Sequence, residues 1–183
     1  MRMPRLFIAI DIPHAIKEDL SQLTGEVPGA RWVPPDQNHL TLRFIGDVDP
    51  PVSAALKKVL ASLSFLPFPL ELRGVGHFPP GRRPPRVLWV GIVETPQLFQ
   101  LQLNVELAVQ EAGIPPEERP FSAHLTLARL KESHGSAVSR FEQQHRELSY
   151  PPFQVAQVIL FSSVLTPQGA IHRKELVVPA AAP

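Results

Sequence analysis

The chain has 183 residues, of which 44% are hydrophobic and 19% charged, as is usual for a soluble globular protein long enough to bury a core. Its formal net charge of +1 neither favours nor excludes a nucleic-acid partner, and the absence of cysteine excludes disulfides, thiol nucleophiles and thiolate metal sites. No stretch approaches the roughly 20 apolar residues of a membrane span, and the N-terminus lacks signal-peptide features, so we expect a cytoplasmic protein without membrane association.

Apolar periodicity and turn residues predict alternating strands and helices along the chain. Asp11 is expected to cap the first helix, and Thr95, which precedes a proline, is expected to cap the third. The expected helices cover 12–24, 50–63, 96–112 and 136–148. The expected strands cover 5–10, 30–33, 39–45, 68–78, 87–93, 121–128, 153–164 and 170–178.

One four-residue motif occurs twice, because His-Leu-Thr-Leu stands at positions 39–42 and again at 124–127. In each half of the chain the strand with the motif is followed by a helix and then by a hairpin. This order indicates a duplication in which two α+β halves face each other. We therefore expect one domain, residues 1–183, built of two pseudo-symmetric lobes, and we expect a monomer because no long exposed apolar helix argues for assembly.

The residue types within the motif point to acid–base chemistry. Side chains on a strand alternate between its faces, so the histidine and threonine of each motif point the same way while the leucines pack behind them. Two such strands brought together would aim two imidazoles and two hydroxyls at one space. Imidazole titrates near neutral pH, so one ring can act as base and the other as acid while the hydroxyls donate to an anion between them.

Two other interpretations of the motif are open. A single histidine on a strand is usually a hydrogen-bonded core residue, although recurrence at matching places in two halves argues against this. A metal site would need a third and usually a fourth ligand, and the nearest acidic residues, Asp36 and Asp47, have no recognisable ligand spacing. We therefore expect no metal and no other cofactor.

The paired motif and its flanks resemble the two-histidine phosphoesterases, and within them the RNA 2′,3′-cyclic phosphodiesterases, also called 2′-5′ RNA ligases. The resemblance covers nearly the whole chain. It implies a bilobed α+β fold in which antiparallel sheets line a central cleft with helices outside. It also implies metal-independent hydrolysis of a terminal 2′,3′-cyclic phosphate to a 2′-phosphate, in some members with reversible 2′-5′ joining of RNA ends. The segments that carry the resemblance are 5–13, 39–46, 86–90, 121–129 and 160–169.

The resemblance also assigns roles within the motif. His39 would donate a proton to the departing ribose oxygen, and His124 would be the base that activates water. Thr41 and Thr126 would hold non-bridging phosphate oxygens. The substrates would be RNA ends or small cyclic nucleotides, and the alternative function is a module that binds an RNA-end phosphate without turnover.

Four further residues are candidates for substrate binding. Strand alternation places Arg43 on the catalytic face and Arg129 on the opposite face unless the strand bulges, whereas the resemblance favours Arg129 as the phosphate contact. His172 stands where the resemblance leads us to expect a tyrosine after the last turn, and it is either a substrate contact or an exposed strand residue. Phe121, like Phe7, is a candidate for stacking on a terminal base, with the core as the alternative.

Overall fold

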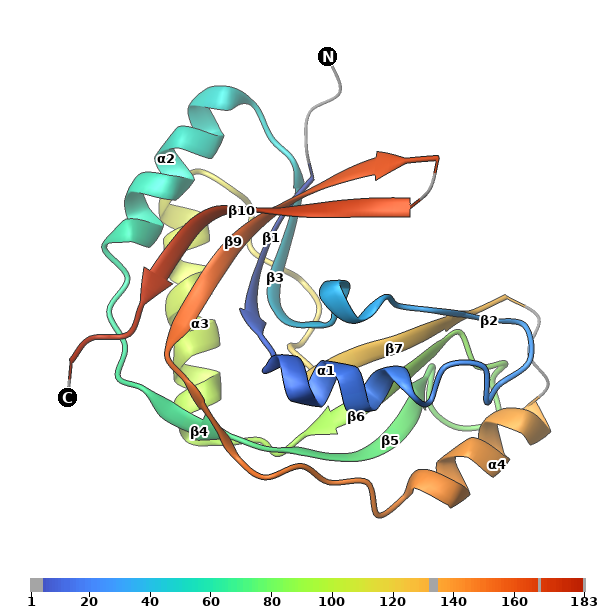
Figure 1. Ribbon diagram of the computed structural model, residues 1–183. Helices are drawn as coiled ribbons and strands as arrows, with labels where there is room; N and C mark the ends of the chain where they lie inside the picture. Colours follow the sequence, from blue (N-terminus) through green and yellow to red (C-terminus); the bar gives the residue numbers. More distant parts are fainter. Residues whose placement is uncertain (1–4, 132–134, 168, 183) are drawn as a thin grey trace.

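The computed structural model describes residues 5–131, 135–167 and 169–182. These residues form four α-helices, ten strands and a short 3-10 helix, η1 (Figure 1). The helices are α1 (His14–Ser21), α2 (Pro50–Ala61), α3 (Pro96–Glu111) and α4 (Gly135–His145), and η1 is Pro35–Gln37. The strands are β1 (Arg5–Asp11), β2 (Ala30–Trp32), β3 (His39–Asp47), β4 (Phe68–Leu70), β5 (Leu72–Phe78), β6 (Val87–Ile92), β7 (His124–Leu130), β8 (Phe153–Val155), β9 (Gln157–Thr166) and β10 (Gly169–Pro179).

Eight of these strands form one sheet in the order β10-β9-β1-β3-β7-β6-β5, with β2 pairing on β7 outside this path. Every neighbouring pair of strands is antiparallel, and the sheet passes from one lobe to the other where β3 meets β7. The first lobe holds β1, β3, β9 and β10, and the second holds β2, β5, β6 and β7. The predicted architecture of two α+β lobes with antiparallel sheets is therefore confirmed.

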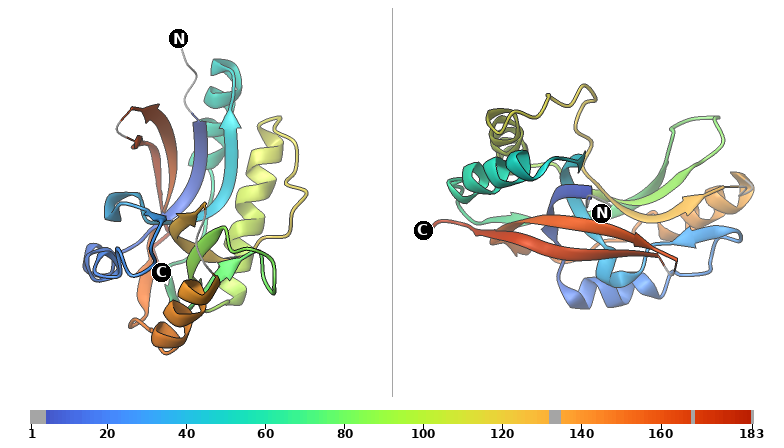
Figure 2. Two further views of the ribbon diagram at one scale, coloured as in Figure 1. Left: turned by 90° about the vertical axis from the view of Figure 1, so that its right-hand side faces the viewer. Right: turned by 90° about the horizontal axis from the view of Figure 1, so that it is seen from above.

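The helices cover one side of the sheet and leave the other side open between the lobes (Figures 1 and 2). In the first lobe α3 packs against β3 and α2, and in the second α4 packs against β5. The main core extends through both lobes, and it contains the buried leucines of both motifs. Thr95 caps α3 as predicted, because its Oγ1 accepts a hydrogen bond from the Leu98 N–H at 3.2 Å. No helix among the described residues is long and apolar enough to cross a bilayer.

Two of the expected strands are each divided in the structure. The segment 68–78 forms β4 and β5, and the segment 153–164 lies in β8 and β9. The two short leading strands, β4 and β8, pair with each other apart from the large sheet. Phe68, Leu70 and Leu72 are all buried at alternate positions, so the apolar pattern continues through the break and gives no sign of it.

The expectation that Asp11 caps the first helix is wrong. Pro13 occupies the N-cap of α1, and no side chain caps that helix. The Asp11 carboxylate instead accepts hydrogen bonds from the Ile12 N–H at 3.0 Å and from the Lys17 ammonium at 2.6 Å. These two hydrogen bonds hold the Asp11 carboxylate at the end of β1.

Candidate active site

The two motifs meet at the junction of β3 and β7. Leu40 and Leu125 are register partners there, and neither side chain is exposed. In an antiparallel pair this register sets His39 opposite Thr126 and Thr41 opposite His124, on the face away from the leucines. The two histidines are then diagonal neighbours, which lie about 7–8 Å apart in such a pair. Two imidazoles and two hydroxyls therefore share one face, which we call the site face.

His39 is the more enclosed of the two histidines. It is 8% exposed, and its ring centroid lies 4.4 Å from that of Phe161 and 6.0 Å from that of Phe7. Burial, together with the nearby Lys17 ammonium, lowers the pKa of His39 from 6.5 to about 4. The imidazole is therefore neutral at pH 7 in the free protein.

Backbone groups act on both imidazoles. The backbone of Gln37, two residues before His39, acts against the fall in the His39 pKa. Nδ1 of His124 is 2.8 Å from the carbonyl oxygen of Ser122, two residues earlier. A carbonyl oxygen can only accept, so the bonded nitrogen carries the hydrogen. In His124 this leaves Nε2 as the nitrogen that exchanges protons with a ligand.

Asp11 is a charged neighbour of His39 that the sequence analysis placed elsewhere. It is the register partner of His39 across β1 and β3, and its Oδ1 lies 3.8 Å from His39 Nε2. The same carboxylate pairs with the buried Lys17 and lies 3.8 Å from the Lys174 ammonium. The Asp11 carboxylate opposes the fall in the His39 pKa. This effect of Asp11 on His39 follows from the pairing of β1 with β3, which the sequence alone does not specify.

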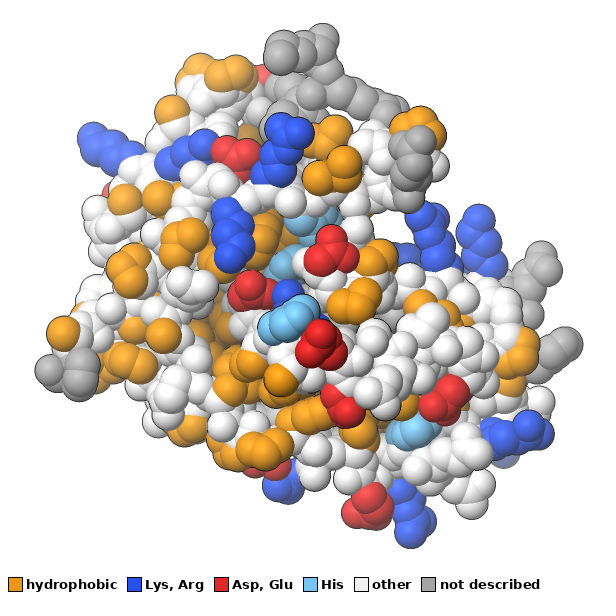
Figure 3. All heavy atoms as spheres, in the orientation of Figure 1, with side chains coloured by type: hydrophobic (Ala, Val, Ile, Leu, Met, Phe, Trp, Pro, Cys, Tyr) orange, Lys and Arg blue, Asp and Glu red, His pale blue; other side chains and the backbone are white. Residues whose placement is uncertain are grey.

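His172 on β10 joins the site. Its ring centroid lies 5.5 Å from that of His39 and 4.9 Å from that of Phe7. Its Nδ1 is buried, and among the described residues that atom has no hydrogen-bond partner. Burial lowers the pKa of His172. The structure places His172 beside His39 on the site face, and its contact with substrate stays a prediction. Figure 3 shows histidine side chains in a hollow between the upper and lower parts of the molecule.

Each motif strand contains a β-bulge at the last leucine of the motif. The register of β3 on β1 shifts between Thr41 and Arg43, and that of β7 on β6 shifts between Thr126 and Ala128. One extra residue therefore stands in each motif strand, Leu42 and Leu127 respectively. A bulge reverses the faces of all later residues relative to a regular strand.

The bulge in β7 brings Arg129 onto the site face. Arg129 is the register partner of Val87, and Thr126 is the partner of Trp89, so the two lie on the same side two rungs apart. The intervening Ala128 pairs with the buried Leu88 and faces the core. Arg129 is exposed, so its guanidinium is available to a ligand.

The bulge in β3 removes Arg43 from the site face, and the geometric expectation for this residue is wrong. Arg43 pairs with the core residue Ile8 and is 8% exposed. Its Nε lies 2.7 Å from Oε2 of Glu106 on α3, and its Nη2 donates to the Pro115 carbonyl at 2.6 Å. The guanidinium is therefore occupied by a buried ion pair on the helix side.

Phe121 also lies away from the histidines. Its ring packs edge-on against Phe99 of α3 at 6.0 Å, and it lies against the main core. A different set of aromatic rings occupies the site face of the first lobe, where Phe7 stacks between Phe161 at 5.2 Å and Phe44 at 6.3 Å. Phe44 is 51% exposed, so the row ends in an open aromatic face. Regular alternation along β3 would turn Phe44 inward, and only the bulge at Leu42 brings it to the site face, so the residue pattern alone does not indicate its position.

Aromatic residues of the second lobe support His124. The ring of Phe78 lies edge-on to His124 at 4.9 Å, and Trp89, opposite Thr126, lies 5.5 Å from Phe78. The indole covers Gly76, where an added β-carbon would come within 2.2 Å of the indole ring. Only glycine leaves room for the indole in this position.

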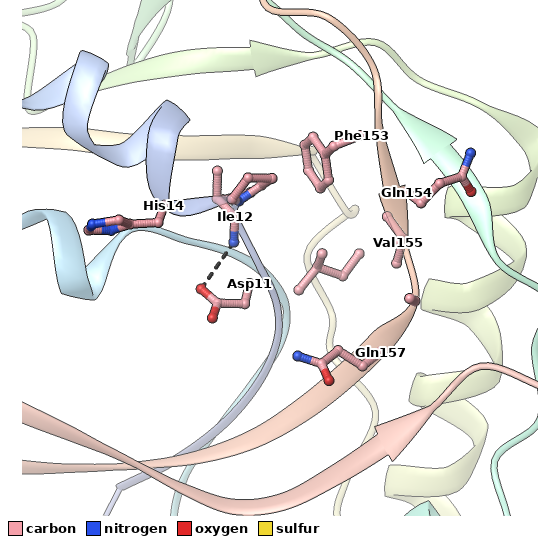
Figure 4. A pocket seen from close by; sticks show the side chains of 10 residues that line it. Asp11, Ile12, His14, Phe153, Gln154, Val155 and Gln157 are labelled. Carbon is pink, nitrogen blue, oxygen red and sulfur yellow. Dashed lines mark hydrogen bonds between the residues drawn. The ribbon is translucent and has the colours of Figure 1, made fainter.

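A cavity of about 340 Å³ borders Asp11, between the end of β1 and the segment that joins β8 to β9 (Figure 4). Its walls include Ile12, Phe153 and Gln157, and Asp11 contributes to both this cavity and the surroundings of His39. Among the described residues no three His, Cys, Asp or Glu side chains are grouped as metal ligands would be.

The sequence matches a family model described as LigT like phosphoesterase twice, over residues 10–89 and 90–172, and each match contains one of the two motifs. The chain is 34% identical to an RNA 2′,3′-cyclic phosphodiesterase of Archaeoglobus fulgidus over 92% of this chain and 96% of that protein. It is 38% identical to a protein of the same name from Aeropyrum pernix, over 80% and 84% of the two chains.

Solved structures share the fold. The crystal structure of E. coli LigT complexed with 3′-AMP superposes with a TM-score of 0.79 at 26% identity, covering 99% of this chain and 100% of that one. A Thermus thermophilus protein superposes with a TM-score of 0.74 at 29% identity, over 96% and 97% of the two chains.

Proposed function

Because the chain belongs to the LigT like phosphoesterase family, we propose that it hydrolyses 2′,3′-cyclic phosphate ends of RNA to 2′-phosphates, without a metal ion. The relatives named RNA 2′,3′-cyclic phosphodiesterase support this substrate. The observation that carries the proposal is the Leu40–Leu125 register, which sets both histidines and both threonines on one face. Joining of RNA ends through a 2′-5′ linkage would be the same displacement at phosphorus, with the 5′-hydroxyl of a second RNA in place of water, and this joining would be reversible.

The reaction needs one proton to be removed and one to be supplied. His124 Nε2 would take a proton from water as the water oxygen attacks phosphorus, and the bond from phosphorus to the ribose 3′ oxygen would break. His39 would give its proton to that departing oxygen, which leaves the phosphate on the 2′ oxygen. Thr41, Thr126 and Arg129 would donate to the non-bridging oxygens as negative charge develops.

The donor role of His39 requires that substrate binding return a proton to its ring. The free protein keeps this imidazole neutral, because burial lowers its pKa to about 4. A phosphate anion on the site face would favour the imidazolium, as the Asp11 carboxylate at 3.8 Å already does. We infer that His39 takes up its proton together with the substrate.

The remaining contacts would hold the nucleoside. The open face of Phe44 next to Phe7 would stack on a base. Nδ1 of His172, which has no hydrogen-bond partner among the described residues, would bond to the ribose or the phosphate. Arg43 and Phe121 take no part in this arrangement. We further propose that the protein is a cytoplasmic monomer, as expected from the sequence.

Turnover of a cyclic nucleotide tests the proposal directly. Cytidine 2′,3′-cyclic phosphate is incubated with the purified protein, and the product isomer is identified by chromatography and phosphorus NMR. Formation of the 2′-phosphate supports the enzyme. Binding of the compound without turnover would replace it with the alternative, a module that binds RNA-end phosphates.

A further inference from the structure

The site face of β7 carries two arginines side by side beyond Thr126. Arg129 and Arg31 are register partners across β2 and β7, and both are exposed. The neighbouring partners Trp32 and Ala128 turn toward the core. The two guanidinium groups therefore project together from the site face.

The two like charges destabilise this part of the sheet slightly unless a ligand neutralises them. Like charges directly opposite each other on antiparallel strands repel and destabilise the pair. Among the described residues, the arginines with a carboxylate partner within 4.0 Å are Arg43, Arg73, Arg119 and Arg146. Arg31 and Arg129 have none within that part of the chain. Figure 3 shows Lys and Arg side chains at the right-hand edge, above the region of β2 and β7 in Figure 1.

The matching place in the first lobe has the opposite character. Phe44 and Arg129 each stand five residues after a motif histidine, and a bulge brings each onto the site face. In the first lobe Phe44 continues an aromatic row, whereas in the second Arg129 continues a cationic pair. The two lobes therefore offer a base-binding wall and a phosphate-binding wall on either side of the catalytic pair.

The spacing suits two successive phosphates of one RNA strand. Arg129 lies two rungs, or about 7 Å, from Thr126 along the strand, and its long side chain can reach back toward the reacting phosphate. Arg31 stands directly beside Arg129, on the neighbouring strand β2. A planar guanidinium there can form two hydrogen bonds to a phosphodiester.

We propose that Arg31, next to Arg129, binds the phosphate on the 5′ side of the terminal ribose. The preferred substrates would then be RNA ends and 5′-phosphorylated cyclic nucleotides, ahead of cyclic nucleotides that lack a 5′-phosphate. This inference rests on the proposed function and adds a specificity to it. Binding of this phosphate would offset the repulsion between Arg31 and Arg129.

Two substrates that differ only in the 5′-phosphate test the inference. The kcat/KM values for cytidine 2′,3′-cyclic phosphate and for its 5′-phosphorylated form are measured with the wild type, Arg31→Gln and Arg140→Gln. Arg140 is an exposed arginine on α4, so its variant makes the same change of charge away from the site face. We expect the wild type to prefer the 5′-phosphorylated form about tenfold or more, as a charge-assisted contact allows.

The preference should fall about tenfold in Arg31→Gln and stay at the wild-type value in Arg140→Gln. The salt dependence of kcat/KM on the 5′-phosphorylated form should also weaken in Arg31→Gln, with a slope of log kcat/KM against log salt smaller by about 0.7. Thermal unfolding should show that Arg31→Gln is at least as stable as the wild type, because the substitution removes a repulsion. An equal preference in the wild type and Arg31→Gln would overturn the inference while leaving the proposed function intact.

If the wild type turns over neither compound, the proposed function fails, and calorimetric binding of the same two compounds decides the inference. Tighter binding of the 5′-phosphorylated form by the wild type than by Arg31→Gln would support the phosphate site. Equal binding by both proteins would overturn it.

Discussion

Leu40 of β3 and Leu125 of β7 face one another where the two lobes join, and both side chains are fully buried. Each leucine lies between the histidine and the threonine of its own motif. Burial of the two leucines against each other therefore fixes where the four polar side chains stand on the opposite face. The placement of both histidines and both threonines therefore depends on a buried contact between the two lobes.

Replacing either motif histidine should remove activity without unfolding the protein. We expect His39→Ala and His124→Ala each to lower kcat on a cyclic nucleotide by about 100-fold or more, the usual effect of losing a general acid or base. Circular dichroism checks folding, and His14→Ala is the control because the side chain of His14 is 83% exposed. Near-normal turnover by a folded His39 or His124 variant would show that the residue has no catalytic role.

His39 should make stability depend on pH in the acidic range. Its pKa in the folded protein, about 4, lies below the ordinary 6.5, so below pH 6.5 the unfolded chain binds the proton more readily. The contribution of His39 to the free energy of unfolding should thus be complete above pH 6.5. It should fall as the pH drops to 4, by up to about 3 kcal/mol. Urea unfolding of the wild type and His39→Asn at several pH values measures the difference. Parallel curves for the two proteins would contradict the prediction.

Substrate binding should be coupled to proton uptake at His39. His124→Asn should bind cytidine 2′,3′-cyclic phosphate without hydrolysing it, and titration calorimetry in buffers of different ionisation enthalpy counts the protons exchanged. Between pH 6 and 7 we expect net uptake, because the bound anion raises the pKa of His39 from its low value in the free protein. The doubly substituted His39→Asn/His124→Asn protein should take up fewer protons. Equal uptake by both proteins would instead make His39 the base and exchange the two roles.

Arg43 should prove important for stability and unimportant for chemistry. Arg43→Met leaves the carboxylate of Glu106, 13% exposed, buried without its partner, which typically costs about 3–5 kcal/mol. Adding Glu106→Gln should recover part of this loss, and Arg73→Met, at an exposed ion pair, should cost less than about 1 kcal/mol. Urea unfolding measures each variant. A folded Arg43→Met protein with a 100-fold loss of kcat/KM would return Arg43 to the substrate site.

Chelation should leave the activity intact. The proposed reaction uses imidazoles, hydroxyls and a guanidinium, so turnover of the cyclic nucleotide should be the same before and after dialysis against EDTA. Loss of activity on dialysis, with recovery when a divalent metal is added back, would favour a metallohydrolase.

The grouping of the motif side chains on one face could be predicted from the sequence because it is local. Histidine and threonine two residues apart on a strand share a face whatever the rest of the fold does. The repeated motif also indicated two lobes, and the structure confirms them. Register between strands is not local, and the face assignment for Arg43 failed because regular alternation does not include the bulge at Leu42. The position of Asp11 beside His39 likewise depends on how β1 pairs with β3.

The duplicated bulge means that spacing as well as composition defines this active site. Leu42 and Leu127 each act as a one-residue insert, which places the residue five positions after each histidine on the site face. Deleting Leu127 would keep every catalytic side chain in the sequence yet turn Arg129 toward the core. In related chains, an alignment gap of one position just after the threonine would therefore matter more than most substitutions nearby.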